Sequence, residues 1–419
     1  MKQRVPIQNQ VPLWKPLTVR NFFLLFLGET ISIVGDQFYL VGLPWLTLQL
    51  TNSGISLGTV LMAAAIPRAI LMLIGGVFSD RFSPRLVMIV GNSLRALLTI
   101  LLTVIIALGA TELWHLYLFA ILFGILDGFF IPATKSIVPK LVNKEYLVAS
   151  NTLIELTNRL ALLIGPALGG LLISVTNIQT AFAINAATFI FTTATLLLIE
   201  DNSRSNAEID IQKNILSKKI FSLIIGIGEG INYVLNNRPL KVILLVLVML
   251  NFLILGPLQV GIPSLADSRF AGGPIALGIM NSAWGGGGLL GTLMPQILPK
   301  IPRLGIIMVT LASIQGFGLF LLGFIPNLLL ASITIGILGL CSGFFTVLGI
   351  VWIQKQTPPE ILGRVMSLGM LASFGIAPFS LALAGLLADN NLTVLFTVSG
   401  GIMSIISLFF MTQATIRQI

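Results

Sequence analysis

The side chains of this sequence that could do chemistry are charged residues inside long apolar stretches. They all lie in the first half of the chain: Glu29, Asp36, Arg68, Arg95, Asp127, Glu155 and Arg159. Burying such a charge in a bilayer costs about 2.5–3.5 kcal/mol on insertion scales, so each one needs a partner or a wet cavity. A carboxyl group in a poorly solvated cavity favours its neutral form, so it can bind a proton on one side and release it on the other. The sequence therefore predicts proton-binding acids in its first half.

Asp36 is the first candidate for a proton-coupling residue, followed by Asp127 and then Glu29. Asp36 lies near the middle of its apolar stretch. Glu29 precedes it by seven residues, which places both acids on nearly one face of a helix. A cationic or polar substrate that competes with the proton for the same carboxylate would be the simplest mechanism of exchange.

The alternative for each acid is a structural ion pair with an arginine. Glu155 and Arg159 stand four residues apart on one predicted helix, and we expect them to pair with each other. Arg68 and Arg95 are expected to hold acids and loop carbonyls rather than to contact substrate. An ion pair from either arginine to Asp127 would remove that acid from coupling.

Length and composition place these charges in a helical membrane protein. The chain has 419 residues, of which 56% are hydrophobic and 9% charged, whereas soluble domains carry about 25% charged residues. One cysteine and one histidine exclude a disulfide scaffold and argue against a metal site. The sequence has no nucleotide-binding loop and no Ser/His/Asp set, so we expect neither an enzyme nor an ATP-driven pump, and no cofactor.

Apolar runs long enough to cross a bilayer predict an all-α protein with twelve transmembrane helices. They lie at residues 21–49, 54–79, 86–109, 113–138, 148–174, 179–199, 240–266, 275–298, 304–324, 326–354, 361–388 and 391–413. The first run is long enough to span, so we expect a transmembrane helix there rather than a signal peptide.

The placement of Lys and Arg predicts that both termini are cytoplasmic. Almost all of the 24 basic residues fall on one side of the predicted topology, and the loops of the other side hold only Arg269. The basic excess therefore reports topology, and we expect no nucleic acid partner. A polar stretch divides the chain into three predicted parts: a six-helix bundle at 1–200, a cytoplasmic linker with an amphipathic helix at 201–238, and a second six-helix bundle at 239–419.

The two halves resemble repeats with an offset of about 215 residues. Phe129-Phe130 aligns with Phe344-Phe345, and Gly170-Leu171-Leu172 aligns with Gly385-Leu386-Leu387. Internal symmetry of this kind is typical of transporters whose two bundles rock about a central site. The repeats therefore favour transport by alternating access.

Two motifs add a family resemblance. The loop Gly75-Gly76-Val77-Phe78-Ser79-Asp80-Arg81-Phe82-Ser83-Pro84-Arg85 resembles the G-x-x-x-D-R-x-G-R-R signature of the major facilitator superfamily, although Ser83 and Pro84 depart from it. Gly165-Pro166-Ala167-Leu168-Gly169-Gly170 resembles the antiporter signature of that family, although Thr152 and Ala161 stand where upstream glycines would fall.

Further segments resemble the 12-span drug:proton antiporter branch, which includes macrolide-efflux and enterobactin exporters. They are Ile31–Asp36, Leu43-Pro44-Trp45, Pro67-Arg68, Leu94-Arg95-Ala96, Ile131-Pro132-Ala133 and Glu229–Tyr233. The resemblance implies a monomer in a cell inner membrane that exports a small amphiphilic compound of drug, macrolide or siderophore type in exchange for protons, in contact with membrane lipid. An uptake symporter, a lysophospholipid flippase and a sensor without flux are the alternatives.

The resemblance also suggests roles for residues outside the charged set. Asp80, Arg81 and Arg85 would form a cytoplasmic gate, with Asp80 facing the positive N-terminal end of the eleventh span; the alternative is that they only anchor the topology. Gly165, Pro166, Gly169 and Gly170 would allow close helix packing and bend the fifth span. Polar and aromatic candidates for the cavity wall are Gln37, Tyr39, Asn251, Gln259, Trp352 and Gln354.

Overall fold

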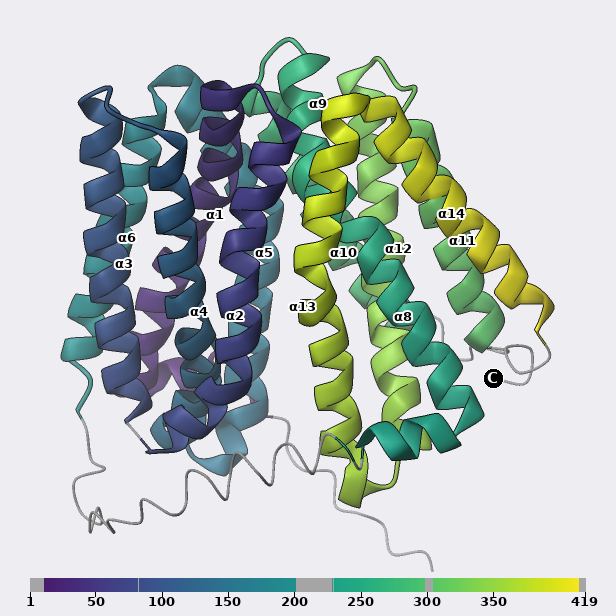
Figure 1. The fold of residues 1–419 in the computed structure, drawn as a ribbon. Coiled ribbons are helices and arrows are strands. Elements are labelled where there is room, and N and C mark those ends of the chain that lie inside the picture. Colours follow the sequence, from purple (N-terminus) through teal and green to yellow (C-terminus); the bar gives the residue numbers. More distant parts are fainter. Residues whose placement is uncertain (1–10, 82, 201–227, 229, 298–303, 414–419) are drawn as a thin grey trace, which may run out of the picture.

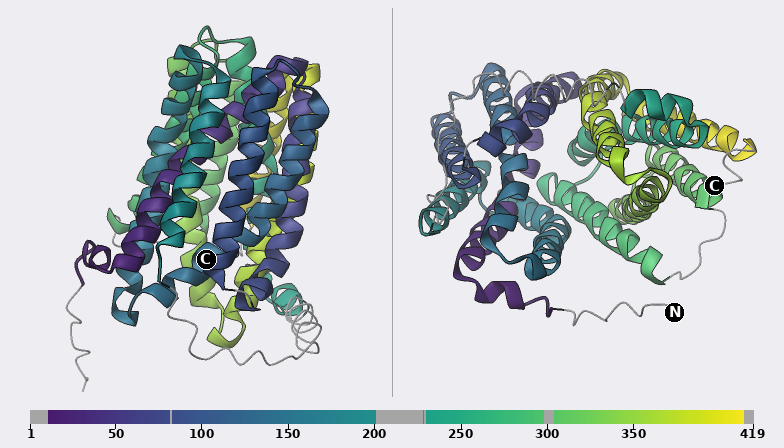
Figure 2. Two further views of the ribbon diagram at one scale, coloured as in Figure 1. Left: turned by 90° about the vertical axis from the view of Figure 1, so that its left-hand side faces the viewer. Right: turned by 90° about the horizontal axis from the view of Figure 1, so that it is seen from below.

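The computed structural model describes residues 11–81, 83–200, 228, 230–297 and 304–413. These residues form long helices joined by short connections, and none of them lies in a β-strand. The helices stand in two groups that follow each other along the chain and lie side by side (Figures 1 and 2). The predicted all-α fold is confirmed.

The first group contains six helices. Their bounds are α1 Arg20–Thr51, α2 Gly54–Arg81, α3 Pro84–Ala107, α4 Leu113–Leu141, α5 Leu147–Val175 and α6 Ile178–Leu197. Helix α6 packs against both α1 and α3, and α2 packs against α4. We call this group the first bundle.

The second group, the second bundle, contains the remaining helices. Their bounds are α8 Arg238–Gly256, α9 Ile262–Ser268, α10 Pro274–Ile297, α11 Leu304–Leu322, α12 Leu328–Gln356, α13 Pro359–Asn390 and α14 Leu392–Thr412. A π-helical turn at Pro257–Gly261 joins α8 to α9. The seventh span was predicted as one uninterrupted helix, and this turn, which begins at a proline, interrupts it.

Ten helices within the described residues are long and apolar enough to cross a membrane. Helices α10 and α13 run beside them in the second bundle, with 24 and 32 residues. The twelve predicted spans are thus all present as helices, with α8 and α9 sharing one of them. The outer face of α3 illustrates why the bundle suits lipid, because it presents a stripe of exposed apolar side chains: Val90, Leu94, Leu97, Leu101 and Val104.

Asparagine side chains cap the starts of four described helices, α6, α8, α12 and α14. The carbonyl oxygen of Asn177 accepts a hydrogen bond from the Thr180 N–H at 2.8 Å, at the start of α6. Asn327 and Asn391 accept equivalent bonds at 2.8 Å at the starts of α12 and α14. A capping oxygen satisfies an N–H group that has no partner within the helix, so these asparagines define where the loops end.

The two ends of the molecule differ in how the bundles meet. We call the end that carries the start of α1 and the end of α6 the linker end, and the opposite end the far end. At the far end, α2 packs against α13 and α5 against α10. A mixed apolar cluster fills this contact, with Leu48 and Leu57 from the first bundle and Leu381, Ala384 and Leu395 from the second.

Glycines let the helix backbones of opposite bundles touch at the far end. A Cβ on Gly58 would lie 3.0 Å from the Cα of Gly385, and a Cβ on Gly385 would lie 2.6 Å from the carbonyl oxygen of Gly54. Gly170 of α5 lies in the same way against Pro274 and Gly278 of α10. Gly170 and Gly385, which the repeat alignment pairs, therefore occupy equivalent places in the two contacts between the bundles.

Candidate functional site

A cavity of about 630 Å³ lies between the two bundles. The first bundle contributes Gln37, Leu40 and Pro44 of α1, Leu61 of α2, and Leu162 and Pro166 of α5. Most of the wall comes from α8 to α13 of the second bundle. The wall includes Ile353, in the last turn of α12, and Val365, near the start of α13, so the cavity reaches towards the linker end.

The described lining residues are apolar, aromatic or neutral and polar, and none is charged. Five carboxamides stand on the wall: Gln37, Asn251, Gln259, Asn281 and Gln315. Trp284, Phe345 and Phe374 add aromatic surface. An apolar pocket of a few hundred Å³ with a few polar groups is typical of a site for a small organic molecule.

The antiporter-like element of α5 holds Gln37 in place. A Cβ on Gly165 would lie 2.7 Å from the Cβ of Gln37, and a Cβ on Gly169 would lie 3.2 Å from the Phe38 ring. Only a residue without a side chain fits at Gly165, because the Gln37 side chain lies directly on that backbone. The element therefore sets the position of a polar group on the cavity wall, beyond its predicted packing role.

The other side of the same element contacts the second bundle. The Ala167 N–H donates to the Ser282 hydroxyl of α10 at 3.0 Å, and Gly278 lies against the backbone of Pro166 and Ala167. Pro166 itself lines the cavity. One turn of α5 thus contacts α1, α10 and the cavity at once.

A charged cluster lies inside the first bundle. Asp127 of α4 forms ion pairs with Arg68 of α2, at 2.8 Å, and with Arg95 of α3. The Arg95 side chain is 5% exposed, and its guanidinium carbon lies 3.9 Å from the centre of the Phe130 ring. The carboxylate of Asp127 therefore links three helices and is engaged on both oxygens.

This double ion pair meets the condition under which the sequence analysis removes Asp127 from the coupling candidates. Asp127 was the second candidate for proton coupling, on the condition that no arginine held it. Two arginines hold it, and protonating Asp127 would remove the counter-ion of both. The sequence left open which arginine would pair, because that depends on how α2, α3 and α4 are rotated towards one another.

Asp36 and Glu29 differ from the other acids of the spans. Both are half-buried on α1, and neither forms an ion pair with a described residue. Asp36 lies within electrostatic range of Arg68, Arg95 and Asp127, while Glu29 lies within range of Arg95 and Asp36. One oxygen of Glu29 is buried without a hydrogen bond. Neither acid lines the cavity.

The pair predicted between Glu155 and Arg159 is present. The Arg159 Nε lies 2.8 Å from a carboxylate oxygen of Glu155, and the Glu155 side chain is 61% exposed. These two charges neutralise each other on α5, away from the Asp127 cluster.

The structure divides the six cavity candidates equally. Gln37, Asn251 and Gln259 line the cavity, whereas Tyr39, Trp352 and Gln354 do not. The Tyr39 ring stacks on Phe123 with 4.8 Å between ring centres, inside the first bundle. Trp352 is buried in the core of the second bundle, and Gln354 is exposed on the last turn of α12. A residue type that suits a cavity wall also suits a core or a helix end, so type alone misplaced these three.

Asn281 and Gln315 are wall residues that were not predicted from the sequence. Both are carboxamides inside predicted spans. The rule that selected Asn251, an amide within an apolar helix, would have found them as well. Trp284 stands one turn after Asn281 on α10 and completes that part of the wall.

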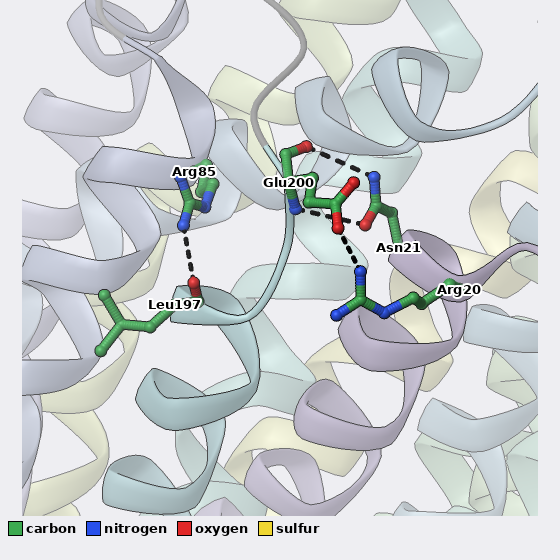
Figure 3. Close-up of polar contacts among 5 residues, drawn as sticks. All are labelled: Arg20, Asn21, Arg85, Leu197 and Glu200. Atoms are coloured by element: carbon green, nitrogen blue, oxygen red, sulfur yellow. Dashed lines mark hydrogen bonds and ion pairs between the residues drawn. The ribbon is translucent and has the colours of Figure 1, made fainter.

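Polar contacts at the linker end tie the first bundle together. Arg20 pairs with Glu200, and the Asn21 side chain bonds both to the Glu200 carbonyl at 3.3 Å and to its N–H at 3.2 Å (Figure 3). Arg85 donates to the carbonyl oxygens of Leu196 and Leu197, each at 2.9 Å. These contacts join the starts of α1 and α3 to the end of α6.

The three predicted gate residues have different outcomes. Arg85 was expected to hold groups of the facing bundle, and the two bonds described here go to carbonyls of its own bundle. The reason is local: the end of α6 leaves carbonyls without helical partners, and a guanidinium satisfies them. Asp80 and Arg81 lie at the end of α2, and their side chains are outside the described part of the chain.

Comparisons with known proteins agree with this architecture. The sequence model of the Major Facilitator Superfamily matches residues 25–380. The multidrug efflux pump Tap of Mycolicibacterium fortuitum is 24% identical over 379 residues, which cover 89% of this chain and 90% of that protein. Macrolide efflux protein A of Streptococcus pyogenes is 22% identical over 373 residues, covering 88% of this chain and 90% of that protein.

Solved structures share the fold at low sequence identity. A crystal structure of the peptide transporter POT superposes with a TM-score of 0.76 at 14% identity and covers 95% of each chain. The match to the family covers far more than half of the sequence and includes both bundles. This chain belongs to the Major Facilitator Superfamily.

Proposed function

We propose that this chain exports small amphiphilic compounds, of drug, macrolide or siderophore type, in exchange for protons by alternating access. The observation that carries the proposal is the cavity between the bundles. It lies on the linker-end side of the far-end contacts and reaches towards the linker end. The names of the relatives, a multidrug efflux pump and a macrolide efflux protein, support export of such compounds.

Alternating access requires that the far-end contacts separate while the linker end closes. The contacts suit that exchange, because they consist of small residues and of hydrogen bonds, and the charged groups among them, Asp389 and Asp267, lie at helix ends rather than in the middle of a span. The rigid units would be the predicted domains, a bundle at 1–200 and a bundle at 239–419, joined by the linker at 201–238.

Asp36 is our first candidate for the proton-coupling residue, and Glu29 is the second. Asp36 lies near both arginines and near Asp127, yet it has no ion pair among the described residues. Binding or releasing a proton there changes the net charge of the cluster that links α2, α3 and α4. Asp36 precedes Gln37 in α1. A small rotation of α1 in response to protonation of Asp36 would therefore move Gln37 on the cavity wall.

The proposed orientation follows from the basic residues. With both termini cytoplasmic in a cell inner membrane, the linker end faces the cytoplasm. The cavity would then be filled from the cytoplasm, which suits an exporter. We propose that the transporting unit is a monomer, because the cavity lies within one chain.

The test uses inverted membrane vesicles with an acidic interior. Wild type, Asp36→Asn and the control Glu155→Gln are each offered a panel of macrolides, siderophores and lipophilic drugs, and the interior pH is followed by a fluorescent amine. We expect at least one compound to dissipate the gradient in wild type and in Glu155→Gln, but not in Asp36→Asn. Glu155 is a sound control because its charge is exposed and paired within one helix.

Other results would redirect the proposal. If Asp36→Asn behaves like wild type with each responding compound, Asp36 is structural and Glu29 becomes the coupling residue to test. If a compound is taken into the cell along with protons, the protein is a symporter. If only lysophospholipid crosses the bilayer in a protein-dependent way, the protein is a lipid flippase and export of drugs is rejected.

A further inference from the structure

We propose that the cavity binds uncharged amphiphiles that carry hydrogen-bond donors, and that the substrate contacts none of the acids of the first bundle. The inference rests on the proposed function, since it takes the cavity as the substrate site. It concerns which chemistry the wall recognises, and it can be tested without any proton gradient.

The wall offers no counter-ion to a charged substrate. Among the described residues that line the cavity, no side chain carries a charge. Asp36, Glu29 and Asp127 belong to the first bundle and are absent from the wall. Moving a cation from water into such a site without a partner is strongly unfavourable, so the wall selects against permanent charge.

Three of the five carboxamides on the wall present their oxygens as acceptors. The amide nitrogen of Asn251 donates to the Leu247 carbonyl at 2.8 Å, and that of Gln315 donates to the Leu338 carbonyl at 3.1 Å. Gln37 donates to the Ile33 carbonyl at 3.3 Å. In each case a backbone carbonyl holds the NH₂ group, and no described residue donates to the amide oxygen.

Gln37 gives the strongest evidence for an acceptor that lacks a partner. It is 4% exposed, it lines the cavity, and its oxygen is buried without any hydrogen bond. A buried amide oxygen that lacks a partner is unfavourable unless a ligand satisfies it. A hydroxyl or amide N–H of the substrate would do so after a rotation of the Gln37 side chain turns this oxygen into the cavity. Gly165 keeps the side chain at this position, because it lies directly against Gln37.

Size and aromatic surface agree with a drug-sized ligand. The volume of about 630 Å³ falls inside the range of about 300–1,000 Å³ that is typical of such sites. Trp284, Phe345 and Phe374 can contact flat apolar rings. The predicted ligand therefore has an apolar body with neutral donors at its edge.

This geometry also separates the substrate from the proton. The sequence alone suggested that the two compete for one carboxylate. With the acids off the wall, a proton on Asp36 and a substrate in the cavity can be bound at the same time. Substrate affinity should then depend little on the protonation of Asp36.

The experiment measures binding to purified full-length protein in detergent, with two probes that share a ring and chain. N-hexyl dansyl amide is neutral and carries a sulfonamide N–H donor. Its analogue ends in a trimethylammonium group on the hexyl chain. Energy transfer from Trp284 to the dansyl ring reports occupancy of the cavity, and Trp284→Phe identifies the share of the signal that arises there.

We expect saturable transfer with the neutral probe and at least about tenfold weaker binding of the cationic probe. Gln37→Leu should weaken binding of the neutral probe about fivefold, as expected for one lost hydrogen bond. Gln37→Glu should strengthen binding of the cationic probe. Such a gain would also show that the variant at position 37 is folded. Asp36→Asn should leave the affinity of the neutral probe within about twofold.

Three outcomes overturn the inference: no saturable transfer with the neutral probe, equal or tighter binding of the cation by wild type, or loss of neutral binding in Asp36→Asn. Failure of proton exchange in vesicles, with neutral binding intact, rejects the antiport proposal and leaves the cavity assignment standing. Proton exchange driven by lipophilic cations, without binding of the neutral probe, rejects the cavity assignment and leaves the antiport proposal standing.

Discussion

The Asp389 carboxylate, at the end of α13, accepts a hydrogen bond of 2.8 Å from the Ser53 hydroxyl, at the start of α2. The same carboxylate also accepts the N–H of Gly54, and the Ser53 oxygen accepts the Ser56 N–H at 3.2 Å. Asp389 therefore caps a helix of the opposite bundle with a negative charge, where the helix dipole is positive. It does at the far end what Asp80 was predicted to do at the linker end.

Removing this cap should favour separation of the bundles at the far end. Asp389→Ala deletes an interaction of about 1 kcal/mol, which shifts the equilibrium between the closed and open far end about fivefold. Spin labels at Ala110 and Phe324, exposed positions in far-end loops of the two bundles, would report the change by pulsed distance measurements. The labels require a Cys341→Ser background, since Cys341 is the chain's one cysteine.

Glu112→Gln is the matched control for Asp389→Ala. Glu112 is also an acid at the far end, but its carboxylate contacts Trp114 of its own bundle at 2.8 Å. This variant should leave the distance distribution unchanged. An unchanged distribution in Asp389→Ala as well would mean that the cap does not hold the far end closed.

The two kinds of acid in the first bundle should differ in their effect on stability. Asp127→Asn leaves Arg68 and the buried Arg95 without a counter-ion, so we expect a loss of about 3–5 kcal/mol in the free energy of unfolding. Asp36→Asn breaks no ion pair among the described residues and should cost less than about 1 kcal/mol. Thermal unfolding of the purified variants, read by tryptophan fluorescence, compares them. Equal destabilisation by both would make Asp36 a structural counter-ion and remove the basis for its coupling role.

The glycine run Gly285–Gly288 allows a test at single-residue resolution. A Cβ on Gly285 would clash with the Leu162 carbonyl of α5, across the two bundles, and a Cβ on Gly287 would clash with the Gly336 carbonyl of α12, within one bundle. The nearest atom to a Cβ on Gly288 is the Gly339 carbonyl oxygen, 3.8 Å away. Gly287→Ala should therefore lower stability, Gly285→Ala should impair transport while the protein still folds, and Gly288→Ala should be tolerated.

Expression level, melting temperature and vesicle transport of these three alanine variants form the measurement. A result in which Gly288→Ala is as harmful as Gly287→Ala would show that packing at this level of α10 is tighter than the contacts indicate.

The orientation in the membrane is directly measurable. In the Cys341→Ser background, a cysteine at Ala110, in the loop between α3 and α4, should react with an impermeant maleimide in intact cells. A cysteine at Ser205, in the linker, should react only in inverted vesicles. The reverse pattern would place the linker end outside and would make the cavity accessible for uptake.

The helices could be predicted because the bilayer imposes a simple rule on each segment separately. A span must be apolar over about 20 residues, and α5 at Leu147–Val175 matches its predicted range of 148–174. The seventh span was less simple, since the π turn at Pro257–Gly261 depends on local backbone geometry that hydropathy does not report.

The site was harder to predict because it depends on how the helices are rotated. Periodicity places Asp36 and Gln37 next to each other, but it does not say that one turns to the arginines while the other turns to the cavity. The two ion pairs of Asp127 join three helices, so no single segment contains the signal. Asp389 was missed because it stands at a helix end, where an acid looks like an ordinary loop residue.

The two bundles contribute unequally to the cavity and to the charged cluster. Most of the cavity wall belongs to helices after Arg238, whereas the acids and arginines of the cluster belong to helices before Glu200. Mutations that reshape the wall can therefore accumulate in one half of the gene without disturbing the charges in the other half. Under the proposed function, selection by a new toxic compound would act mainly on that second half, and the half that holds the charged cluster could remain unchanged while the range of expelled compounds evolves.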